Sequence, residues 1–197
     1  MTFVIITGGF DLSVGSTFAF GGLITGQFLL MDYPIFIAII AGIVSGALVG
    51  YINGILITKV KVNPFVTTLG TMTILRGIVL LATQGNPLTG FPPEFAELGQ
   101  GKLFGIFYPI IILVFSLILA DFLLRKSRFL RQTYYIGGNE EAARLSGINV
   151  ENVKIWTYII TGMLAAFAGI ISTSKTGSTS PIAGTGAELR IIAAVII

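Results

Sequence analysis

Long apolar stretches alternate with short polar segments along the whole chain. An apolar helix needs about 20 residues to cross a bilayer core of ~30 Å. Residues 1–10 and 191–197 are apolar but too short to cross. The pattern therefore predicts an all-α, polytopic integral membrane protein, a helical bundle with a truncated span at each end and five complete spans, at Leu12–Met31, Ile35–Thr58, Asn63–Thr83, Leu103–Ala120 and Ile155–Ser174.

Composition narrows the class further. Charged residues make up 11% of the 197 residues and hydrophobic residues 54%, whereas soluble domains have about 25% charged residues. Cys and His are both absent, which excludes disulfides, thiol catalysis and Cys or His metal sites, and removes the commonest general base. The net charge of +3 is small and lies mainly in one segment, so it indicates membrane topology rather than nucleic-acid binding.

The basic residues predict an orientation. Six of the twelve Lys and Arg lie in the segment Arg125–Lys154, and Lys59 and Lys61 form another basic turn an even number of spans away. Basic loops stay on the cytoplasmic side, so both segments are expected there. The loops at Asp32, Gln84–Lys102 and Lys175–Glu188 are then extracytoplasmic. A chain that starts and stops within apolar segments is expected to be a fragment, one transmembrane domain over residues 1–197.

A short helix is predicted inside the cytoplasmic loop. Gly137-Gly138 interrupts the chain, Asn139 suits an N-cap, and Glu140 and Glu141 favour the helix dipole in the first turn. Gly147 is a natural residue to follow the last turn. Two turns are marginal alone, so the helix either lies on lipid headgroups or docks into a groove on a cytoplasmic partner. The segment as a whole is Asn139–Ile148 and includes Ala142, Ala143, Arg144 and Leu145.

Four glycines recur every fourth residue in the second span. This spacing places them on one helix face, where another helix can approach closely. The alternative is chance enrichment in a glycine-rich membrane protein. The helix-packing candidates are Gly42, Gly46, Gly50 and Gly54.

Several polar residues fall at membrane depth and each has two interpretations. Asp11 either caps the next helix or marks a backbone break that lines a transport path. Arg76 needs an acid, a carbonyl group or water, so it either makes a structural pair or contacts a substrate. Hydroxyls and amides suit a neutral polar solute, but Thr also bonds its own helix backbone. The translocation candidates are Asp11, Ser13, Asn63, Thr67, Thr71 and Arg76.

Two short segments hint at an internal repeat. Asp11-Leu12 follows Gly8-Gly9 and starts an apolar helix, and Glu188-Leu189 follows Gly184-Thr185-Gly186 and starts another. An inverted repeat would place them on opposite sides of the membrane. Coincidence is an equally good explanation of two short matches.

Three segments, in matching order, resemble permease subunits of monosaccharide ABC importers. They are Gly8–Gly15 (GGFDLSVG), residues 53–72 with the sequence NPFVTTLGTM at 63–72, and Ile136–Ile148 (IGGNEEAARLSGI). The resemblance implies that Asn139–Ile148 is a coupling helix fitting a cleft on a cytoplasmic ATP-binding subunit. It also implies an extracytoplasmic sugar-binding protein that docks outside, where 84–102 is exposed, and a second permease chain, in a homodimer or heterodimer.

The chain lacks the Gly-x-x-x-x-Gly-Lys-Ser/Thr phosphate loop. No cofactor is therefore expected on this chain, and ATP and Mg are expected on the partner subunit. The expected function is non-enzymatic: import of a ribose-like sugar by alternating access in the cytoplasmic membrane of a prokaryote, with lipid as the surrounding partner.

Alternatives are a permease for a nucleoside, a sugar-derived signal or a branched-chain amino acid, a passive channel, and an intramembrane enzyme. Ala187 and Arg190 depart from the aromatic and acidic residues common in the family at these positions, which leaves the solute open.

Overall fold

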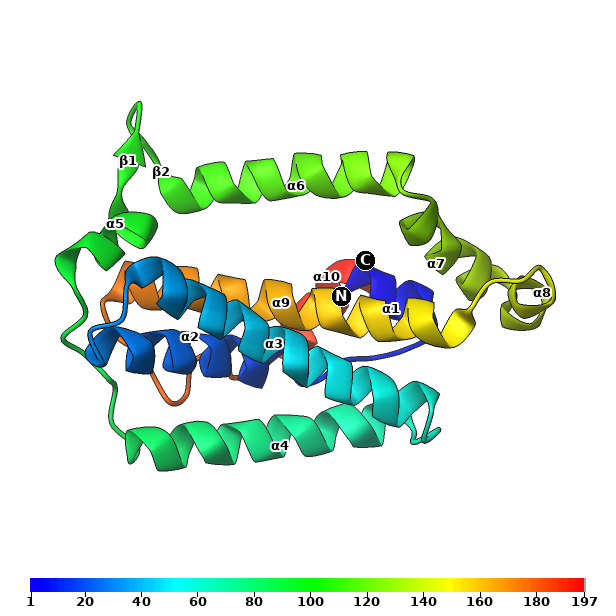
Figure 1. The fold of residues 1–197 in the computed structure, drawn as a ribbon, viewed down its shortest axis with the longest axis horizontal. Helices are drawn as coiled ribbons and strands as arrows, with labels where there is room; N and C mark the ends of the chain where they lie inside the picture. The colour runs from blue at the N-terminus through cyan, green and yellow to red at the C-terminus, as the bar shows by residue number, and fades with distance from the viewer. Residues whose placement is uncertain (197) are drawn as a thin grey trace.

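The computed structural model describes residues 1–196. Helices dominate this part of the chain, and a small hairpin, β1 (Lys102–Leu103) and β2 (Ile106–Phe107), is its one regular sheet. The helices, shown in Figure 1, are α1 (Thr2–Ile6), α2 (Val14–Leu30), α3 (Ile35–Thr58), α4 (Pro64–Thr83), α5 (Pro93–Gln100), α6 (Tyr108–Lys126), α7 (Arg128–Gly138), α8 (Glu140–Leu145), α9 (Val150–Thr176) and α10 (Ala187–Ile196).

The predicted all-α membrane fold is confirmed. Within residues 1–196, four helices are long and apolar enough to span a bilayer, namely α3, α4, α6 and α9, with 24, 20, 19 and 27 residues. The fifth predicted span is the apolar helix α2, which has 17 residues and lies at the short end of the spanning range of about 17–25. The protein is a multi-pass membrane protein.

The start of the predicted span Leu103–Ala120 is wrong. Its first residues instead form β1 and β2, which pair around Phe104 and Gly105, both with positive φ. The helix α6 starts at Tyr108, with a proline in its first turn, and continues to Lys126. Proline is favoured in a first turn, where its missing N–H is not needed. The glycine turn and this proline therefore outweigh the apolar run.

Most of the basic segment Arg125–Lys154 is helical rather than loop. Ser127 caps α7 by accepting a hydrogen bond from the Leu130 N–H. Asn149 caps α9 through the Asn152 N–H, at 3.1 Å. The helix α9 therefore starts five residues before the predicted Ile155 and includes Lys154.

The centre of the bundle is formed by α2, α3 and α9, with α4 and α6 on opposite sides (Figure 1). Glycines bring these three helices into backbone contact. A Cβ added at Gly46 would overlap the Gly162 backbone, and one at Gly50 would overlap the Tyr158 backbone. The same holds for Gly54 against Ile155, and for Gly42 against the backbone of α2 and Ile170. All four candidate glycines thus lie at helix contacts.

The two ends of the bundle differ. One end carries α8 (the α8 end), and the opposite end carries α5 and the hairpin (the α5 end) (Figure 1). Lys61 lines a polar hollow together with Glu140, Arg144 and Lys154, so the two basic segments share the α8 end. At the α5 end, the Ser174 hydroxyl donates to the Phe95 carbonyl, and Gln100 donates to the Lys175 carbonyl at 2.9 Å.

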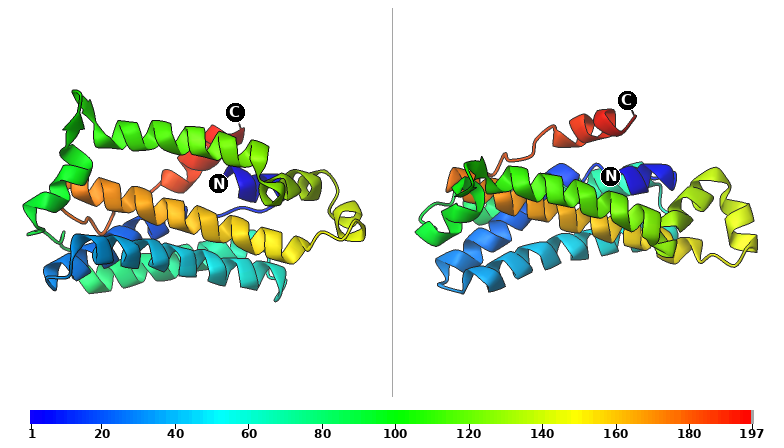
Figure 2. Two further views of the ribbon diagram at one scale, coloured as in Figure 1. Left: turned by 45° about the horizontal axis from the view of Figure 1, so that its top comes forward. Right: turned by 90° about the horizontal axis from the view of Figure 1, so that it is seen from above.

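The prediction that Lys175–Glu188 is wholly an outer loop is wrong. After Gly177, the chain turns back along the bundle from the α5 end toward α10 (Figure 2). Gly184 lies against Gly15, at the first turn of α2, so a Cβ on either would overlap the carbonyl oxygen of the other. The helix α2 is about 25 Å long, and its other end packs against α5. Gly184 therefore lies well inside the bundle, level with the start of α2. We call residues 178–186 the re-entrant segment.

Candidate functional site

The break between α1 and α2 is organised by Asp11. Its Oδ1 accepts hydrogen bonds from the Ser13 backbone N–H, at 2.9 Å, and from the Ser13 hydroxyl, at 2.6 Å. Both residues are 1% exposed. The N-cap residue of α2 is Ser13, and no side chain caps the helix, so the interpretation of Asp11 as the helix cap is wrong. Asp11 instead holds Ser13 in a turn just before the helix. Because α2 starts near the middle of the bundle (Figure 1), this turn lies inside the protein.

The turn formed by Asp11 and Ser13 is linked to α3 and α4. The Asn53 side-chain amide donates to the Ser13 hydroxyl at 3.0 Å, and the Thr71 hydroxyl donates to Asn53 Oδ1 at 2.6 Å. Asn53 is fully buried. We call Asp11, Ser13, Asn53 and Thr71 the central polar network. A buried amide must find partners, so this network joins three helices.

Asn53 was not among the predicted translocation residues. The sequence contained a signal for it, because Asn53 precedes Gly54 in the glycine face that packs against α9. Asn53 also lies three residues after Gly50, and so on the same helix face, where side chains are buried, and a buried amide requires polar partners.

Two other predicted residues lie outside this network. The Thr67 backbone carbonyl accepts from the Thr71 hydroxyl at 3.0 Å, and Thr67 Oγ1 is buried without a hydrogen-bond partner among residues 1–196. Asn63 is exposed, and its Oδ1 caps α4 by accepting from the Phe65 N–H at 2.8 Å. The structure therefore places Asn63 at the α8 end, away from Asp11 and Ser13.

Arg76 binds the re-entrant segment. Its Nη1 donates to the carbonyls of Pro181, at 3.2 Å, and Ala183, at 2.7 Å. Glu188 follows the re-entrant segment, and its Oε1 accepts from the Gly186 N–H at 3.2 Å. An intramembrane Arg requires partners of this kind. They come from a part of the chain more than 100 residues away.

The helix α8 is short but well anchored. Asn139 Oδ1 accepts a hydrogen bond from the Ala142 N–H at 2.9 Å, and Gly147 follows the helix with a φ of 83°. Lys154 of α9 lies 2.7 Å from Glu140, and this hydrogen bond lowers the pKa of the Glu140 carboxyl below its ordinary value. Arg144 lies 3.4 Å from Glu140 and 4.0 Å from Glu151.

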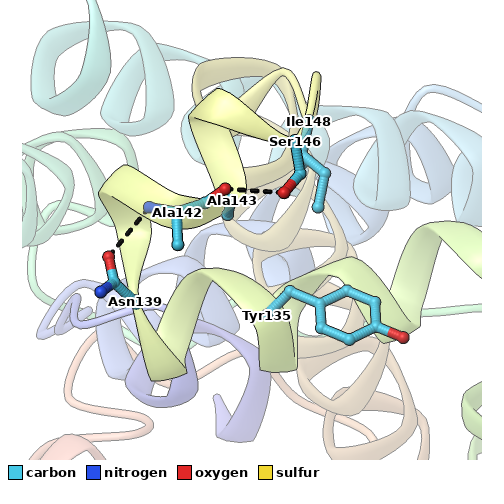
Figure 3. A pocket seen from close by; sticks show the side chains of 6 residues that line it. All are labelled: Tyr135, Asn139, Ala142, Ala143, Ser146 and Ile148. Atoms are coloured by element: carbon cyan, nitrogen blue, oxygen red, sulfur yellow. Dashed lines mark hydrogen bonds between the residues drawn. The ribbon is translucent and has the colours of Figure 1, made fainter.

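The two sides of α8 have different surroundings. Ala143 is buried, and it packs in an apolar cluster with Ile136, Val150 and Val153, which Ile148 joins from the side. Leu145 points away from this cluster and is 85% exposed. Next to α8 is a hollow of about 310 Å³, shown in Figure 3, which is lined by Tyr135, Asn139, Ala142, Ala143, Ser146 and Ile148. The outward side of α8 therefore offers Glu141 and Leu145 to a partner.

No metal site is evident in the described part of the chain. Among residues 1–196, no three Asp or Glu side chains gather as metal ligands. The polar groups of the central polar network and around Arg76 are an amide, hydroxyls, the separated carboxylates of Asp11 and Glu188, and one guanidinium, all of which can form hydrogen bonds.

Comparison with known proteins decides the family. A family model described as the permease component of the branched-chain amino acid transport system matches residues 1–197. The chain belongs to this permease family. The resemblance to permeases of sugar importers is also confirmed, because the chain is 43% identical to the ribose import permease of Haemophilus influenzae and 46% identical to that of Bacillus subtilis, over 100% of the chain.

The chain is also similar to the permease of another sugar transport system. The D-allose transport system permease of Escherichia coli is 37% identical over 99% of the chain and 60% of its own length. The chain spans 62% of the length of the two ribose permeases. No solved structure matches the chain.

Proposed function

We propose that this chain is part of the transmembrane permease subunit of an ATP-driven importer that carries a monosaccharide across the cytoplasmic membrane of a prokaryote. A separate ATP-binding subunit binds ATP and Mg, a sugar-binding protein docks on the extracytoplasmic side, and a second permease chain completes the path. The chain itself performs no covalent chemistry. The ribose, allose and arabinose permeases among its relatives support a sugar as the solute.

The observation that carries the proposal is the placement of α8. This helix projects beyond the spans, turns Leu145 outward with 85% of its surface exposed, and is anchored to α9 by the ion pair between Lys154 and Glu140. A helix that is exposed on one side and anchored to a span on the other can transmit a displacement from a cytoplasmic partner to that span. A passive channel has no use for such an element.

A second contact connects this end to the polar interior. Gly137 of α7, next to α8, lies against the backbone of Ile6 at the end of α1, where a Cβ would not fit. The chain then passes through Gly8 and Gly9 to Asp11. Movement of α8 therefore reaches the start of α2 through α7 and α1, and reaches the rest of the bundle through α9.

The central polar network supplies the groups that a sugar needs. Its hydroxyls and amide bond one another in the present arrangement, while Thr67 Oγ1 is buried and free of partners among the described residues. In alternating access, the protein holds two arrangements and exposes one site to each side in turn. We infer that sugar hydroxyls replace the mutual hydrogen bonds of Ser13, Asn53 and Thr71 as the helices separate.

The test targets α8. Leu145→Asp and Glu141→Arg place charges on its exposed side and should abolish association with the ATP-binding subunit, while the permease still inserts in the membrane. Phe104→Asp is the matched control, because Phe104 is 96% exposed at the α5 end and should leave association unchanged. Unchanged ATPase binding by both α8 variants would rule out the docking role.

The solute is tested separately. Uptake of labelled ribose, allose, arabinose and a branched-chain amino acid is measured with the complete importer. The family description names branched-chain amino acids, so that solute is the competing candidate. Saturable uptake of a sugar and none of the amino acid is the expected result, and the reverse would refute the proposed substrate class.

A further inference from the structure

The re-entrant segment is irregular backbone placed beside the helices of a membrane protein. It begins after Gly177 and turns at Gly184 and Gly186, with φ values of 65°, 70° and 74°. Non-helical backbone at membrane depth is tolerated only where the protein or enclosed water satisfies its polar groups. The contacts that satisfy this segment therefore decide whether it stays in place.

Three contacts hold the segment along its length. Near the α5 end, Thr179 and Leu88 exchange two backbone hydrogen bonds, of 2.9 and 3.1 Å. In the middle, Arg76 donates to the two carbonyls described above. At its deep end, Gly184 lies against Gly15 of α2.

Arg76 is the central contact. Within residues 1–196, two side chains of spans hydrogen-bond the re-entrant segment. Thr176, at the end of α9, donates to the Ser178 carbonyl two residues away, whereas Arg76 reaches the middle of the segment from α4. Ala183 packs against the apolar cluster of Ala19, Leu23 and Val79 on α2 and α4. The hydrogen bonds from Arg76 therefore hold the re-entrant segment against these two helices. The guanidinium group donates hydrogen bonds to two backbone carbonyls, so it is engaged with the protein rather than with a solute.

The segment lies between the α5 end and the central polar network. It runs from Gly177 at the end of α9 to Gly184 beside Gly15, and Gly15 is two residues from Ser13 of the network. On the proposed import path, a solute from the α5 end therefore meets this segment before it reaches Ser13. Glycines with left-handed φ at both ends provide points about which the segment can swing.

Resting on the transport function proposed above, we propose that Arg76 is a positioning residue that holds the re-entrant segment across the α5 side of the translocation path. Release of the two Arg76 hydrogen bonds opens the path toward the central polar network. A purely structural brace would behave differently, because its loss would loosen the whole bundle rather than this segment alone.

Cysteine labelling distinguishes these cases. The chain has no Cys, so single reporter cysteines have no background within it. Ala183→Cys reports on the re-entrant segment, and Phe104→Cys, at the exposed hairpin, serves as the reference. Each is made with Arg76, Arg76→Met or Arg76→Lys in the complete importer, and the rate of reaction with a membrane-impermeant maleimide is measured.

Arg76→Met should raise the labelling rate of Ala183→Cys by about tenfold or more, because two charge-assisted hydrogen bonds are lost. The rate at Phe104→Cys should not change, and Arg76→Lys should restore part of the protection. An unchanged rate at Ala183→Cys would overturn the proposal, and so would loss of the folded permease or exposure throughout the bundle. Because labelling does not depend on sugar uptake, this experiment can contradict the proposed role of Arg76 without contradicting the proposed transport function.

A crosslink tests the movement itself. Leu88 and Thr179 form an antiparallel pair that exchanges hydrogen bonds, with an expected Cα separation of about 5.5 Å, which suits a disulfide. Oxidised Leu88→Cys/Thr179→Cys should lose uptake and regain it on reduction. Full uptake by the oxidised protein would show that the segment does not need to move. The reduced double variant is the control for transport as such.

Discussion

The Lys154 ammonium group donates a 2.7 Å hydrogen bond to the Glu140 carboxylate and so joins α9 to α8. Lys154 lies near the start of a 27-residue span, and Glu140 is the first residue of the exposed helix. The pair is partly exposed, with 21% of the Lys154 side chain and 46% of the Glu140 side chain accessible. Its role is therefore geometric more than energetic, because exposed ion pairs contribute about 0.2–1 kcal/mol.

Breaking this pair should uncouple the importer without unfolding it. We expect Lys154→Met to retain ATPase binding but to reduce ATP-driven uptake several-fold. The exchanged pair Glu140→Lys/Lys154→Glu should recover part of it. Lys126→Met, which removes a basic residue at the end of α6 and outside this pair, is the matched control. Uptake by Lys154→Met equal to that of the control would argue against mechanical transmission through the pair.

The same pair predicts a pH dependence. The pKa of Glu140 is lowered in the folded protein, chiefly by the Lys154 hydrogen bond, so the folded state favours the ionised carboxylate. The stabilisation is present above the unfolded pKa of about 4.3 and is lost as the pH falls through the lower folded value. Lys154→Met should remove this acid-side loss, which thermal unfolding between pH 3 and pH 6 would detect. Identical pH profiles for the two proteins would contradict the assignment.

Close helix packing at Gly46 predicts a large effect of a larger side chain. A leucine there would overlap the Gly162 backbone, and overpacking costs about 1–3 kcal/mol or more. Gly46→Leu should therefore lower the unfolding temperature of the detergent-solubilised protein markedly. Gly70→Leu is the control, since an added Cβ at Gly70 meets nothing within 4 Å. Equal losses at the two positions would mean that helix propensity, and not packing, sets the effect.

The buried Asn53 predicts a combined loss of stability and transport. Asn53→Leu removes the donor to Ser13 and the acceptor for Thr71, and stranded buried groups cost about 1–3 kcal/mol. Uptake should fall much further than stability, since the same groups are proposed to contact the sugar. Asn86→Leu, at an exposed asparagine, should change neither. An Asn53→Leu protein with normal uptake would exclude Asn53 from the translocation path.

The Asn139 cap of α8 should affect binding of the ATP-binding subunit. Asn139→Ala removes the acceptor for the Ala142 N–H and should weaken the helix by about 1 kcal/mol. Affinity for the ATP-binding subunit should fall up to about tenfold, because the partner must then order the helix. Asn63→Ala removes the cap of the longer α4 and serves as the comparison, with ATPase affinity unchanged. Equal affinities for the Asn139→Ala variant and the parent would show that α8 needs no preformed cap.

Most features that depend on neighbouring residues were predicted correctly from the sequence. The apolar runs that became α2, α3, α4 and α9 were located within a few residues, and the helix after Asn139 was expected from its cap and its glycines. The start of α6 and the extent of α7 were missed. There, the glycine–proline turn chemistry and the buried residues Leu130, Thr133 and Ile136 outweighed plain hydropathy.

Features that depend on distant residues could not be read in the same way. Arg76 was an arginine at membrane depth with unknown partners, and the structure supplies them from residues 181 and 183. In the sequence, Asn53 is one residue next to the glycine face of α3. In the structure, its side chain links the start of α2 to α4 through two hydrogen bonds. The polar stretch after Lys175 resembled an outer loop, because polarity alone does not tell whether water or protein satisfies a backbone.

The sequence by itself determined that this is a helical membrane protein, roughly where its long apolar helices lie, and where a short capped helix lies between two of them, since hydropathy and capping act over a few residues. Tertiary structure decided which glycine faces which backbone, which polar groups join at the start of α2, and that the chain turns back beside Arg76. Those outcomes depend on the packing of segments up to 169 residues apart, as between Gly15 and Gly184, where burial makes each polar group require a partner that no local pattern specifies.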